Sequence, residues 1–327
     1  MQQQIADLRK QNDLLVNRLY QLNDSTNKLL YRDVLSKRTV IKSFHPLVSI
    51  IIPVYNGSNY LSEAIDCALG QIYDNIEIIV INDGSTDGGA TEKIALSYKG
   101  KIHYYKKENG GVSSALNFGI KHMSGEYFAW LSHDDLITSD HIANLVEWAS
   151  YKEASNEIPF SSFFLANERG EYLYDESRDA QLYYSDFKYS LTTADSSLLL
   201  GEINGGSVLI PKKAFDQVGL FNERLRITQE RDLWNRLSRY YRFINIPFCT
   251  AVIRIHNSQV SSKAETVTKA SNKKILEIVD SLSKDRIHNS FPNKRWLLLA
   301  LERFYQNNSR HVLEKEMLKR LNEKEES

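Results

Sequence analysis

Between residues 47 and 131 the chain alternates short apolar or aromatic runs with segments of helical periodicity, and this alternation limits the fold more than any other feature. The runs occupy 47–54, 76–81, 102–105 and 127–131, and the first two are rich in β-branched residues. Helical spacing is found over 60–71 and 91–98, and a glycine turn at 109–114 opens a helix that runs to Met123. A continuously apolar run is typical of a strand buried on both faces. The alternation therefore predicts an α/β fold with a mostly parallel central sheet and right-handed crossovers.

Composition excludes several classes of protein. Lys plus Arg and Asp plus Glu each number 41 in 327 residues, so no net field attracts nucleic acid. Cys67 and Cys249 lie in apolar surroundings, which fits a reducing compartment. The longest apolar runs are shorter than the ~18 residues of a membrane helix, and the N-terminus lacks the apolar region of a signal peptide. We expect a cytoplasmic protein that binds no nucleic acid.

A seven-residue repeat runs through residues 1–36. Its apolar positions are Ile5, Leu8, Leu15, Leu19, Leu22 and Leu29, with Asn12 and Thr26 in the remaining places. The repeat predicts an N-terminal helix over 1–40 that forms a coiled coil, and hence a homo-oligomer through 1–36. The alternative is a single amphipathic helix lying on the rest of the protein. Basic residues outnumber acidic ones eight to four through Lys42, which leaves room for peripheral contact with anionic lipid at the inner face of the plasma membrane.

Two adjacent carboxylates, Asp134 and Asp135, end the apolar run at 127–131. In open α/β sheets ligands bind outside the carboxyl ends of the strands. Adjacent carboxylates there repel each other unless a positive charge lies between them and the ligand. Mg²⁺ meets this need, because it binds through one or two carboxylates together with substrate phosphates. The alternative is a solvated turn in which an Asp caps a helix.

The ends of the first, second and fourth predicted strands meet at one rim, so Tyr55, Asp83 and the Asp134–Asp135 pair are expected to face one ligand. The Asp83 carboxylate is suited to accept from an imide N–H or a ribose hydroxyl. The glycine turn at 110–111 offers close backbone approach and N–H groups at a helix N-terminus. The chain has neither a dinucleotide-binding glycine fingerprint after the first strand nor a P-loop.

Four segments in order resemble the successive signatures of family 2 glycosyltransferases. They are 48–56 (Val-Ser-Ile-Ile-Ile-Pro-Val-Tyr-Asn), 82–87 (Asn-Asp-Gly-Ser-Thr-Asp), 109–113 (Asn-Gly-Gly-Val-Ser) with Asn117 and Gly119, and 131–135 (Leu-Ser-His-Asp-Asp). The resemblance covers about 47–256 and implies the GT-A fold, with most members inverting enzymes that use nucleotide-diphosphate sugars. It implies a catalytic domain over 47–260, in which 243–246 and 251–255 are expected to be strands. Three helices are expected to form a C-terminal extension over 261–327.

The resemblance also implies roles for residues in the donor site. Nucleotide binding falls to Pro53, Tyr55, Asp83, Gly110, Gly111 and Asn117. The family's metal motif is Asp-x-Asp. Here Ser132 takes the first place and Asp134 the second, the position that usually contacts a Mn²⁺ or Mg²⁺ cofactor. His133 is interpreted as a bystander that points the other way on the strand. His256, in an Arg-x-His element, is expected to ligate the metal or touch the diphosphate, and a purely structural role is the alternative.

Segment 228–234 (Thr-Gln-Glu-Arg-Asp-Leu-Trp) resembles the family segment that carries the catalytic base, which places that role on Glu230. The chemistry needs a carboxylate that takes the proton of the acceptor hydroxyl. Asp232 is the nearby rival, and the alternative for Glu230 is an acid that stabilises the helix N-terminus. The resemblance assigns the sugar and acceptor pocket to Gly205, Gly206, Ser207 and Asp135.

The predicted function is transfer of a hexosyl or N-acetylhexosaminyl group, with inversion, from a nucleotide-diphosphate donor. A UDP-sugar is the favoured donor, and the acceptor is a carbohydrate or a lipid-linked carbohydrate. The resemblance implies a place in surface polysaccharide biosynthesis of the capsule or O-antigen kind. The alternative, from the Ser132 departure, is a catalytically degenerate nucleotide-binding scaffold assembled through the N-terminal coiled coil.

Overall fold

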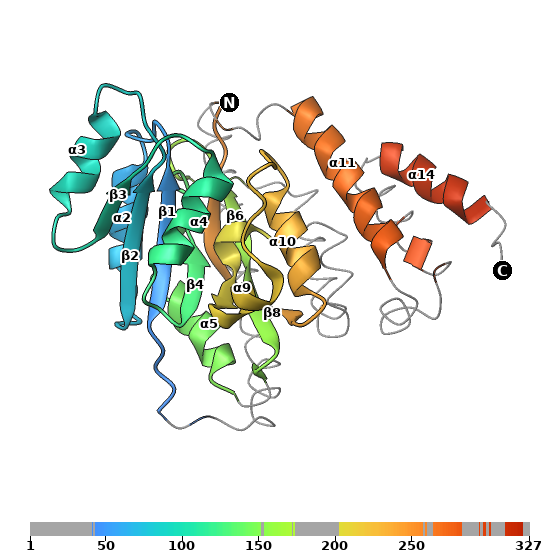
Figure 1. Cartoon of the computed structure of the whole chain (residues 1–327), viewed down its shortest axis with the longest axis horizontal. Coiled ribbons are helices and arrows are strands. Elements are labelled where there is room, and N and C mark those ends of the chain that lie inside the picture. Colours follow the sequence, from blue (N-terminus) through green and yellow to red (C-terminus); the bar gives the residue numbers. More distant parts are fainter. Residues whose placement is uncertain are drawn as a thin grey trace, which may run out of the picture.

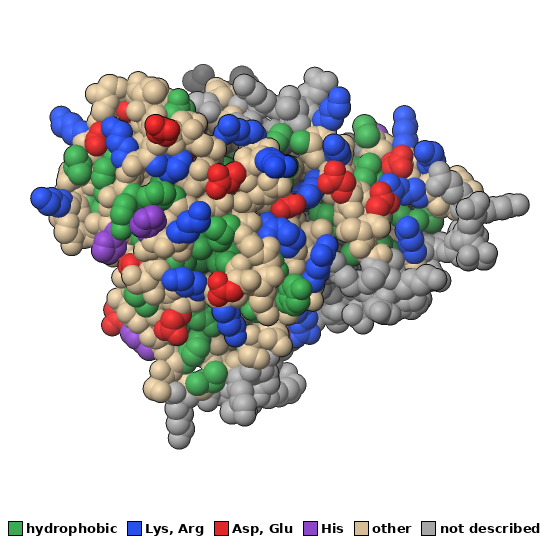
Figure 2. Space-filling view, viewed as in Figure 1, with side chains coloured by type: hydrophobic (Ala, Val, Ile, Leu, Met, Phe, Trp, Pro, Cys, Tyr) green, Lys and Arg blue, Asp and Glu red, His purple; other side chains and the backbone are tan. Residues whose placement is uncertain are grey.

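The computed structural model describes residues 41, 43–151, 154–171, 173, 203–257, 259, 264–282, 294, 297–298, 301 and 311–322. The predicted N-terminal helix over 1–40, and with it the coiled coil, lies outside these residues. None of the helices in the described segments is long and apolar enough to cross a membrane. Acidic and basic side chains are interspersed over the face in Figure 2, as expected from the equal numbers of both signs.

A five-stranded sheet forms the centre of the molecule, in the order β3-β2-β1-β4-β7 (Figure 1). Its strands are β1 (Val48–Val54), β2 (Ile76–Asn82), β3 (His103–Lys106), β4 (Tyr127–Trp130) and β7 (Leu209–Pro211). The first four are parallel, and β7 pairs antiparallel with β4. This confirms the predicted mostly parallel α/β sheet. Every residue of β1 is buried, which explains why all of its residues except Ser49 are apolar.

Helices cover both faces of this sheet, and successive residues of β1 contact opposite layers. On one face Ile50 and Ile52 belong to the apolar cluster that includes α2 (Leu61–Leu69) and α5 (His141–Ala149). On the other face Ile51 packs with α4 (Val112–His122). A Cβ at Gly119 of α4 would lie 2.6 Å from Ile51 Cγ2, so this glycine lets α4 lie close against β1. α3 (Ala90–Ser97) follows β2.

A second sheet has the order β5-β8-β6, with β5 at Leu136–Ile137, β6 at Glu157–Ala166 and β8 at Arg242–Arg254. The prediction of two separate strands in 243–255 is wrong, because β8 is continuous. The register against β6 shifts between Phe160 and Ser162, whose partners on β8 are Asn245 and Cys249, so β8 carries extra residues at this point. Pairing of β5 with the end of β8 brings the Asp134–Asp135 turn beside Arg254.

The remaining described elements are helices that follow β6 and β8 in the chain. η2 (Gly205–Ser207), α9 (Lys213–Val218) and α10 (Gln229–Leu237) lie between β6 and β8 in the chain, and β7 falls between η2 and α9. α11 (Ala264–Ser281) and α14 (His311–Asn322) share a small apolar cluster that includes Ile275 and Met317. Both lie on the side of the molecule away from α3, with α11 next to α10 (Figure 1).

Candidate active site

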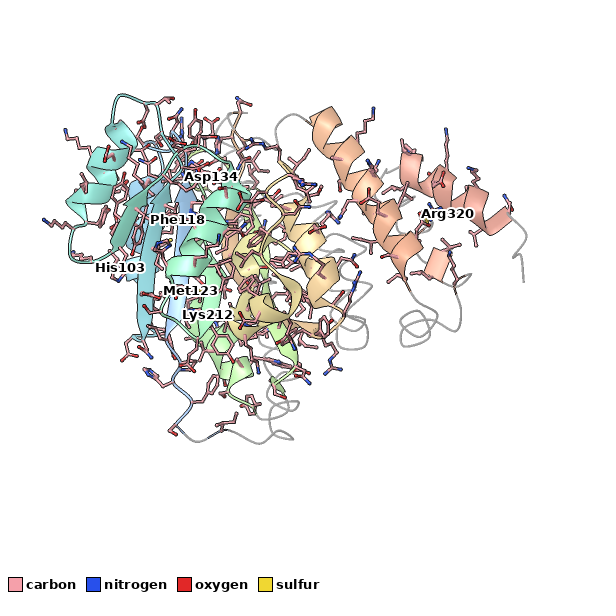
Figure 3. The ribbon with its side chains drawn as sticks, in the orientation of Figure 1. His103, Phe118, Met123, Asp134, Lys212 and Arg320 are labelled. Atoms are coloured by element: carbon pink, nitrogen blue, oxygen red, sulfur yellow. The ribbon has the colours of Figure 1, made fainter. Side chains whose placement is uncertain are left out.

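A cavity of about 1340 Å³ opens where β1, β2 and β4 end. Its lining includes residues from all four N-terminal motifs and from both late segments: Pro53, Tyr55, Asp83, Gly111, Ser132, Asp134, Asp135, Glu230 and His256. In Figure 3 Asp134 lies at this end of the sheet, with Met123 and Lys212 toward the other end. The structure therefore brings these sequence-predicted residues to one place.

Asp134 and His256 lie in direct contact although 122 positions separate them. His256 Nε2 is 3.0 Å from Asp134 Oδ2, and Gln259 Nε2 donates to the same oxygen at 3.4 Å. Burial raises the pKa of Asp134, but neighbouring His133 and the His256 hydrogen bond outweigh burial, so the pKa lies below its usual value. Asp134 is consequently an ionised carboxylate facing the cavity.

A divalent cation fits this pair of residues. A carboxylate oxygen and an imidazole nitrogen are both ligands that Mn²⁺ accepts. In the described part of the chain no cluster of three or more His, Cys, Asp or Glu side chains is placed to hold a metal. Substrate phosphates and water would therefore supply the other ligands, as is usual for cations of this class.

Asp135 differs sharply from its neighbour. Burial and repulsion from Asp134 raise its pKa to about 8, against the opposing effects of Arg254 and Ser132. Its Oδ1 accepts the backbone N–H of Arg254 at 2.9 Å. Asp135 lines the cavity, but its carboxyl group is also a structural link between the acidic turn and β8.

Arg254 holds the acidic turn in place. Its buried guanidinium donates to the Asp134 carbonyl at 2.9 Å and to the Glu63 carboxylate at 2.8 Å, and it stacks 4.2 Å from the centre of the Tyr60 ring. Sequence reasoning gave Arg254 no role of its own. The only signal was its place two residues before His256, because its partners lie far away in sequence.

His133 does not point away from the site, so that part of its interpretation is wrong. β4 ends at Trp130, and the Asp135 N–H bonds to the Ser132 carbonyl at 3.1 Å. A turn has therefore replaced the strand alternation on which the prediction relied. His133 lines the cavity, its Nδ1 lies 4.0 Å from Asp134 Oδ1, and its ring covers Gly57 so closely that a Cβ there would collide with it.

Asp83 holds the glycine turn. Its carboxylate accepts from Lys107 Nζ at 2.7 Å, from the Gly110 N–H at 3.0 Å and from the Gly111 N–H at 2.7 Å. Gly111 has φ +87° and lines the cavity, whereas Gly110 lies behind it. A carboxylate can accept about four hydrogen bonds. These three donors therefore leave Asp83 with about one free acceptor position, which a base or ribose donor would occupy.

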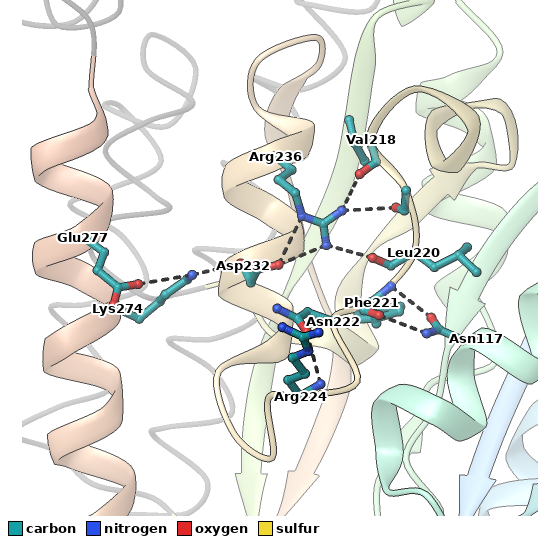
Figure 4. Close-up of polar contacts among 11 residues, drawn as sticks. Asn117, Val218, Leu220, Phe221, Asn222, Arg224, Asp232, Arg236, Lys274 and Glu277 are labelled. Carbon is teal, nitrogen blue, oxygen red and sulfur yellow. Dashed lines mark hydrogen bonds and ion pairs between the residues drawn. The ribbon is translucent and has the colours of Figure 1, made fainter.

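Asn117 lies outside the cavity lining, so its expected position along the nucleotide does not fit the structure. Its amide donates to the Phe221 carbonyl and accepts the Phe221 N–H, both at 2.9 Å (Figure 4). It also donates to Glu223 Oε1 at 2.9 Å. These bonds fix the loop before α10 against α4. No local pattern indicates this role, because the partners lie 104 and 106 positions away in the chain.

The structure separates Glu230 from its rival. Glu230 lines the cavity in the first turn of α10, and burial raises its pKa. Asp232 instead pairs with Arg236 at 3.0 Å and with Lys274 at 2.8 Å (Figure 4). Burial opposes ionisation of Asp232, but Lys274 and Arg236 outweigh it, and the pKa is lowered. Asp232 therefore binds Lys274 of α11 and orients Arg236, which in turn donates to the Val218 carbonyl at the end of α9.

Thr228, immediately before α10, has φ +65° and lines the cavity. This left-handed conformation is strained for a β-branched residue. Such strain is retained where the surrounding structure imposes it, and it concentrates at functional sites. The conformation sets where α10 starts, and hence where Glu230 lies.

A smaller cavity of about 210 Å³ adjoins the first at Glu230. Its other lining residues are Trp130, Ser132, Phe163, Ile203, Asn204, Gly205, Gln229, Arg231 and Trp234. Sequence reasoning missed Trp130 and Gln229, whose buried Nε1 and Oε1 have no hydrogen-bond partner within the described segments. Gly206 and Ser207 are outside this lining. They form η2, in which the Gly206 N–H donates to Asn204 Oδ1 at 2.7 Å.

Gly205 lies flat against the Trp130 ring, and a Cβ there would collide with that ring. We expect Gly205→Ala to destabilise the protein by ~1–3 kcal/mol, the usual cost of overpacking, and to narrow the smaller cavity. Thermal unfolding measures the first effect and crystallography the second. Gly206→Ala is the matched control, because its nearest contacts would be 3.3 and 3.4 Å. Equal stability of Gly205→Ala and wild type would contradict this account.

Comparison with known proteins identifies the family. The model of the family described as "Glycosyl transferase family 2" matches residues 49–258, well over half of the chain. The chain belongs to glycosyltransferase family 2. A Rickettsia bellii relative, named as an uncharacterized glycosyltransferase, is 42% identical over 254 residues, covering 77% of this chain and 36% of the relative. This glycosyltransferase thus spans little more than a third of that relative's length.

Solved structures agree on the fold. A Pyrobaculum calidifontis mannosyltransferase, in complex with GDP-Man and Mn²⁺, aligns with TM-score 0.60 and 17% identity over 89% of this chain and 83% of that chain. S. aureus TarS residues 1–349, in complex with UDP, aligns with TM-score 0.54 and 15% identity over 80% and 72%. At these identities the likeness is one of fold, and it confirms the GT-A architecture of this glycosyltransferase.

Proposed function

We propose that this glycosyltransferase moves a sugar from a nucleotide-diphosphate donor to a hydroxyl group of a saccharide, with inversion. One observation carries the proposal: the ionised Asp134 carboxylate with His256, and the buried Glu230 carboxyl, face the same cavity. The first pair is suited to a cation that carries a diphosphate. The Glu230 carboxylate is suited to accept a proton from the attacking hydroxyl.

In the reaction the acceptor oxygen attacks the anomeric carbon while Glu230 takes its proton. The bond between that carbon and the diphosphate oxygen breaks at the same time, so a single displacement inverts the configuration. Asp134 and His256 would hold Mn²⁺ or Mg²⁺, which when bound stabilises the negative charge on the departing diphosphate. The hydrogen bonds from His256 and Gln259 favour the ionised form of Asp134 and orient it.

The favoured donor is a UDP-sugar. The Asp83 carboxylate, with Pro53 and Tyr55 beside it in the cavity lining, is suited to accept from the imide N–H of uracil. Tyr55 is 45% exposed, which leaves its ring available to stack on a base. The TarS and mannosyltransferase complexes contain UDP and GDP-Man, and uracil and guanine each carry a ring N–H that a carboxylate can accept.

The acceptor is proposed to be a carbohydrate or a lipid-linked carbohydrate, and the transferred group a hexosyl or N-acetylhexosaminyl unit. The setting that fits is surface polysaccharide synthesis in the cytoplasm, at the inner face of the plasma membrane. The basic excess through Lys42 supports such a peripheral contact. Oligomerisation through residues 1–36 rests on the heptad pattern alone.

Nucleotide binding by calorimetry tests the proposal. UDP, GDP, CDP and dTDP are titrated into the full chain, each with and without Mn²⁺. We expect UDP to bind most tightly and Mn²⁺ to strengthen its binding, because the cation joins the diphosphate to Asp134. If Mn²⁺ strengthens binding of none of the four nucleotides, the proposed site is not a donor site. The replacement of the family's first Asp by Ser132 would then indicate the scaffold alternative.

A further inference from the structure

Part of the large cavity is walled by residues outside the family match, which ends at residue 258. Ser271 and Asn272 of α11 line it, together with His311 and Val312 at the start of α14. These four residues carry hydroxyl, amide, imidazole and methyl groups, with no lysine, arginine or carboxylate among them. This wall, Ser271–Asn272 with His311–Val312, is therefore chemically suited to a neutral, hydroxyl-rich ligand rather than to a phosphate.

An ion pair fixes the α11 part of this wall relative to Glu230. Lys274 Nζ lies 2.8 Å from Asp232 Oδ1 and 3.4 Å from Glu277 (Figure 4). Lys274 and Asp232 are each only 17% exposed at the side chain, so solvent screens their attraction less than at the surface. Because Asp232 follows Glu230 by two residues in α10, α11 keeps a set position beside the proposed base.

Asn272 is the polar side chain of this wall that best fits direct ligand contact. It is 8% exposed, and its buried Oδ1 accepts no hydrogen bond from the described segments of the chain. A buried acceptor without a donor costs free energy, and a donor from a molecule in the cavity removes that cost. A sugar hydroxyl is a donor of the required kind.

We propose that the C-terminal helices form the acceptor subsite of this enzyme, with Asn272 accepting a hydrogen bond from a hydroxyl of a neutral acceptor sugar. The inference rests on the proposed transferase function and assigns one of its substrates to α11. The donor is bound by the strand ends and the acidic turn, which belong to the family core. Asn272 is then a specificity residue for the acceptor and has no part in donor binding.

The test separates donor chemistry from acceptor recognition in the full chain. Hydrolysis of UDP-glucose, UDP-galactose and UDP-GlcNAc is measured with Mn²⁺ and without acceptor. Transfer is measured to the p-nitrophenyl glycosides of glucose, galactose, GlcNAc and GalNAc. For Asn272→Leu we expect the acceptor KM to rise about tenfold, the value of one hydrogen bond. Donor hydrolysis and UDP affinity should be unchanged.

Two further variants sharpen the experiment. Lys273→Met is the matched control, because Lys273 is adjacent on α11 and 80% exposed at the side chain, and it should behave as wild type. Asn272→Asp keeps an acceptor oxygen and should recover part of the lost acceptor affinity, which a loss of local packing would not allow. Hydrogen exchange in α11 should slow when the preferred glycoside is added to the UDP–Mn²⁺ complex.

Several results would overturn the inference. One is an Asn272→Leu variant whose acceptor KM equals that of wild type, and another is a parallel fall in hydrolysis and transfer. A third is a wild-type enzyme that hydrolyses the donor but transfers sugar to none of the glycosides, while none of the glycosides slows hydrogen exchange in α11. Failure of the proposed function is distinguishable, because wild type would then neither hydrolyse a donor nor bind UDP more tightly with Mn²⁺.

Discussion

Replacing Glu230 by Gln is expected to lower kcat for sugar transfer by ~10²–10⁴-fold, the usual contribution of a general base. The amide has nearly the same shape as the carboxyl group but cannot take the proton of the acceptor hydroxyl. UDP affinity and its enhancement by Mn²⁺ should be unchanged, because Glu230 is not placed among the metal-binding residues. Steady-state transfer rates together with calorimetry measure both quantities.

Asp232→Asn is the matched control for this prediction. Asp232 bridges Arg236 and Lys274, so its loss should lower the melting temperature and reduce the rate far less than Glu230→Gln. The pH dependence is a second readout. Burial raises the pKa of Glu230, and the base must be ionised, so kcat should fall as pH drops through this raised value. Full activity in Glu230→Gln, with loss in Asp232→Asn, would reverse the assignment.

Replacing Asp134 by Asn is expected to abolish the enhancement of UDP binding by Mn²⁺. Changes to residues that only support metal ligands commonly cost 10–100-fold in metal affinity, so loss of a direct ligand should cost at least ~100-fold. An amide oxygen carries no net charge, and the cation would then be held by His256 and substrate alone. Calorimetric titration of UDP at fixed Mn²⁺, and of Mn²⁺ at fixed UDP, gives the two affinities.

Asp135→Asn is the matched control for Asp134→Asn, because the two residues are adjacent. Burial and Asp134 raise the pKa of Asp135 to about 8, so near neutral pH its carboxyl group is largely uncharged. An Asn there retains an oxygen for the Arg254 N–H and should leave the Mn²⁺ effect largely intact. If Asp135→Asn abolishes the metal effect and Asp134→Asn does not, Asp135 is the metal ligand.

The central sheet and its ligand-binding edge could be predicted from the sequence because their signals are local. The apolar runs at 47–54 and 76–81 match β1 and β2 closely, since a strand buried on both faces needs consecutive apolar residues. The acidic pair at 134–135 was placed at the end of β4 by the same reasoning. Asp134 and His256 were recognised from motifs, and the structure brings them into contact.

Other assignments needed partners that are far away in sequence. The direction of His133 depended on where β4 gives way to a turn, which no alternation pattern marks. Asn117 looked like a nucleotide ligand, but its hydrogen bonds reach residues 221 and 223. The part of the cavity wall that includes Asn272 could not be predicted, because no local sequence pattern shows which face of α11 lines a cavity.

The sequence by itself determined the family, the parallel sheet and the set of acids available for chemistry. Only the tertiary structure decided where each acid lies and which groups surround it. Glu230 and Asp232 are two residues apart with similar side chains, yet one lines the cavity and the other pairs with Lys274. Asp134 and Asp135 are adjacent, yet their pKa values shift in opposite directions. The reason is physical: burial and charged neighbours set the state of a carboxyl group, and the folded chain supplies both.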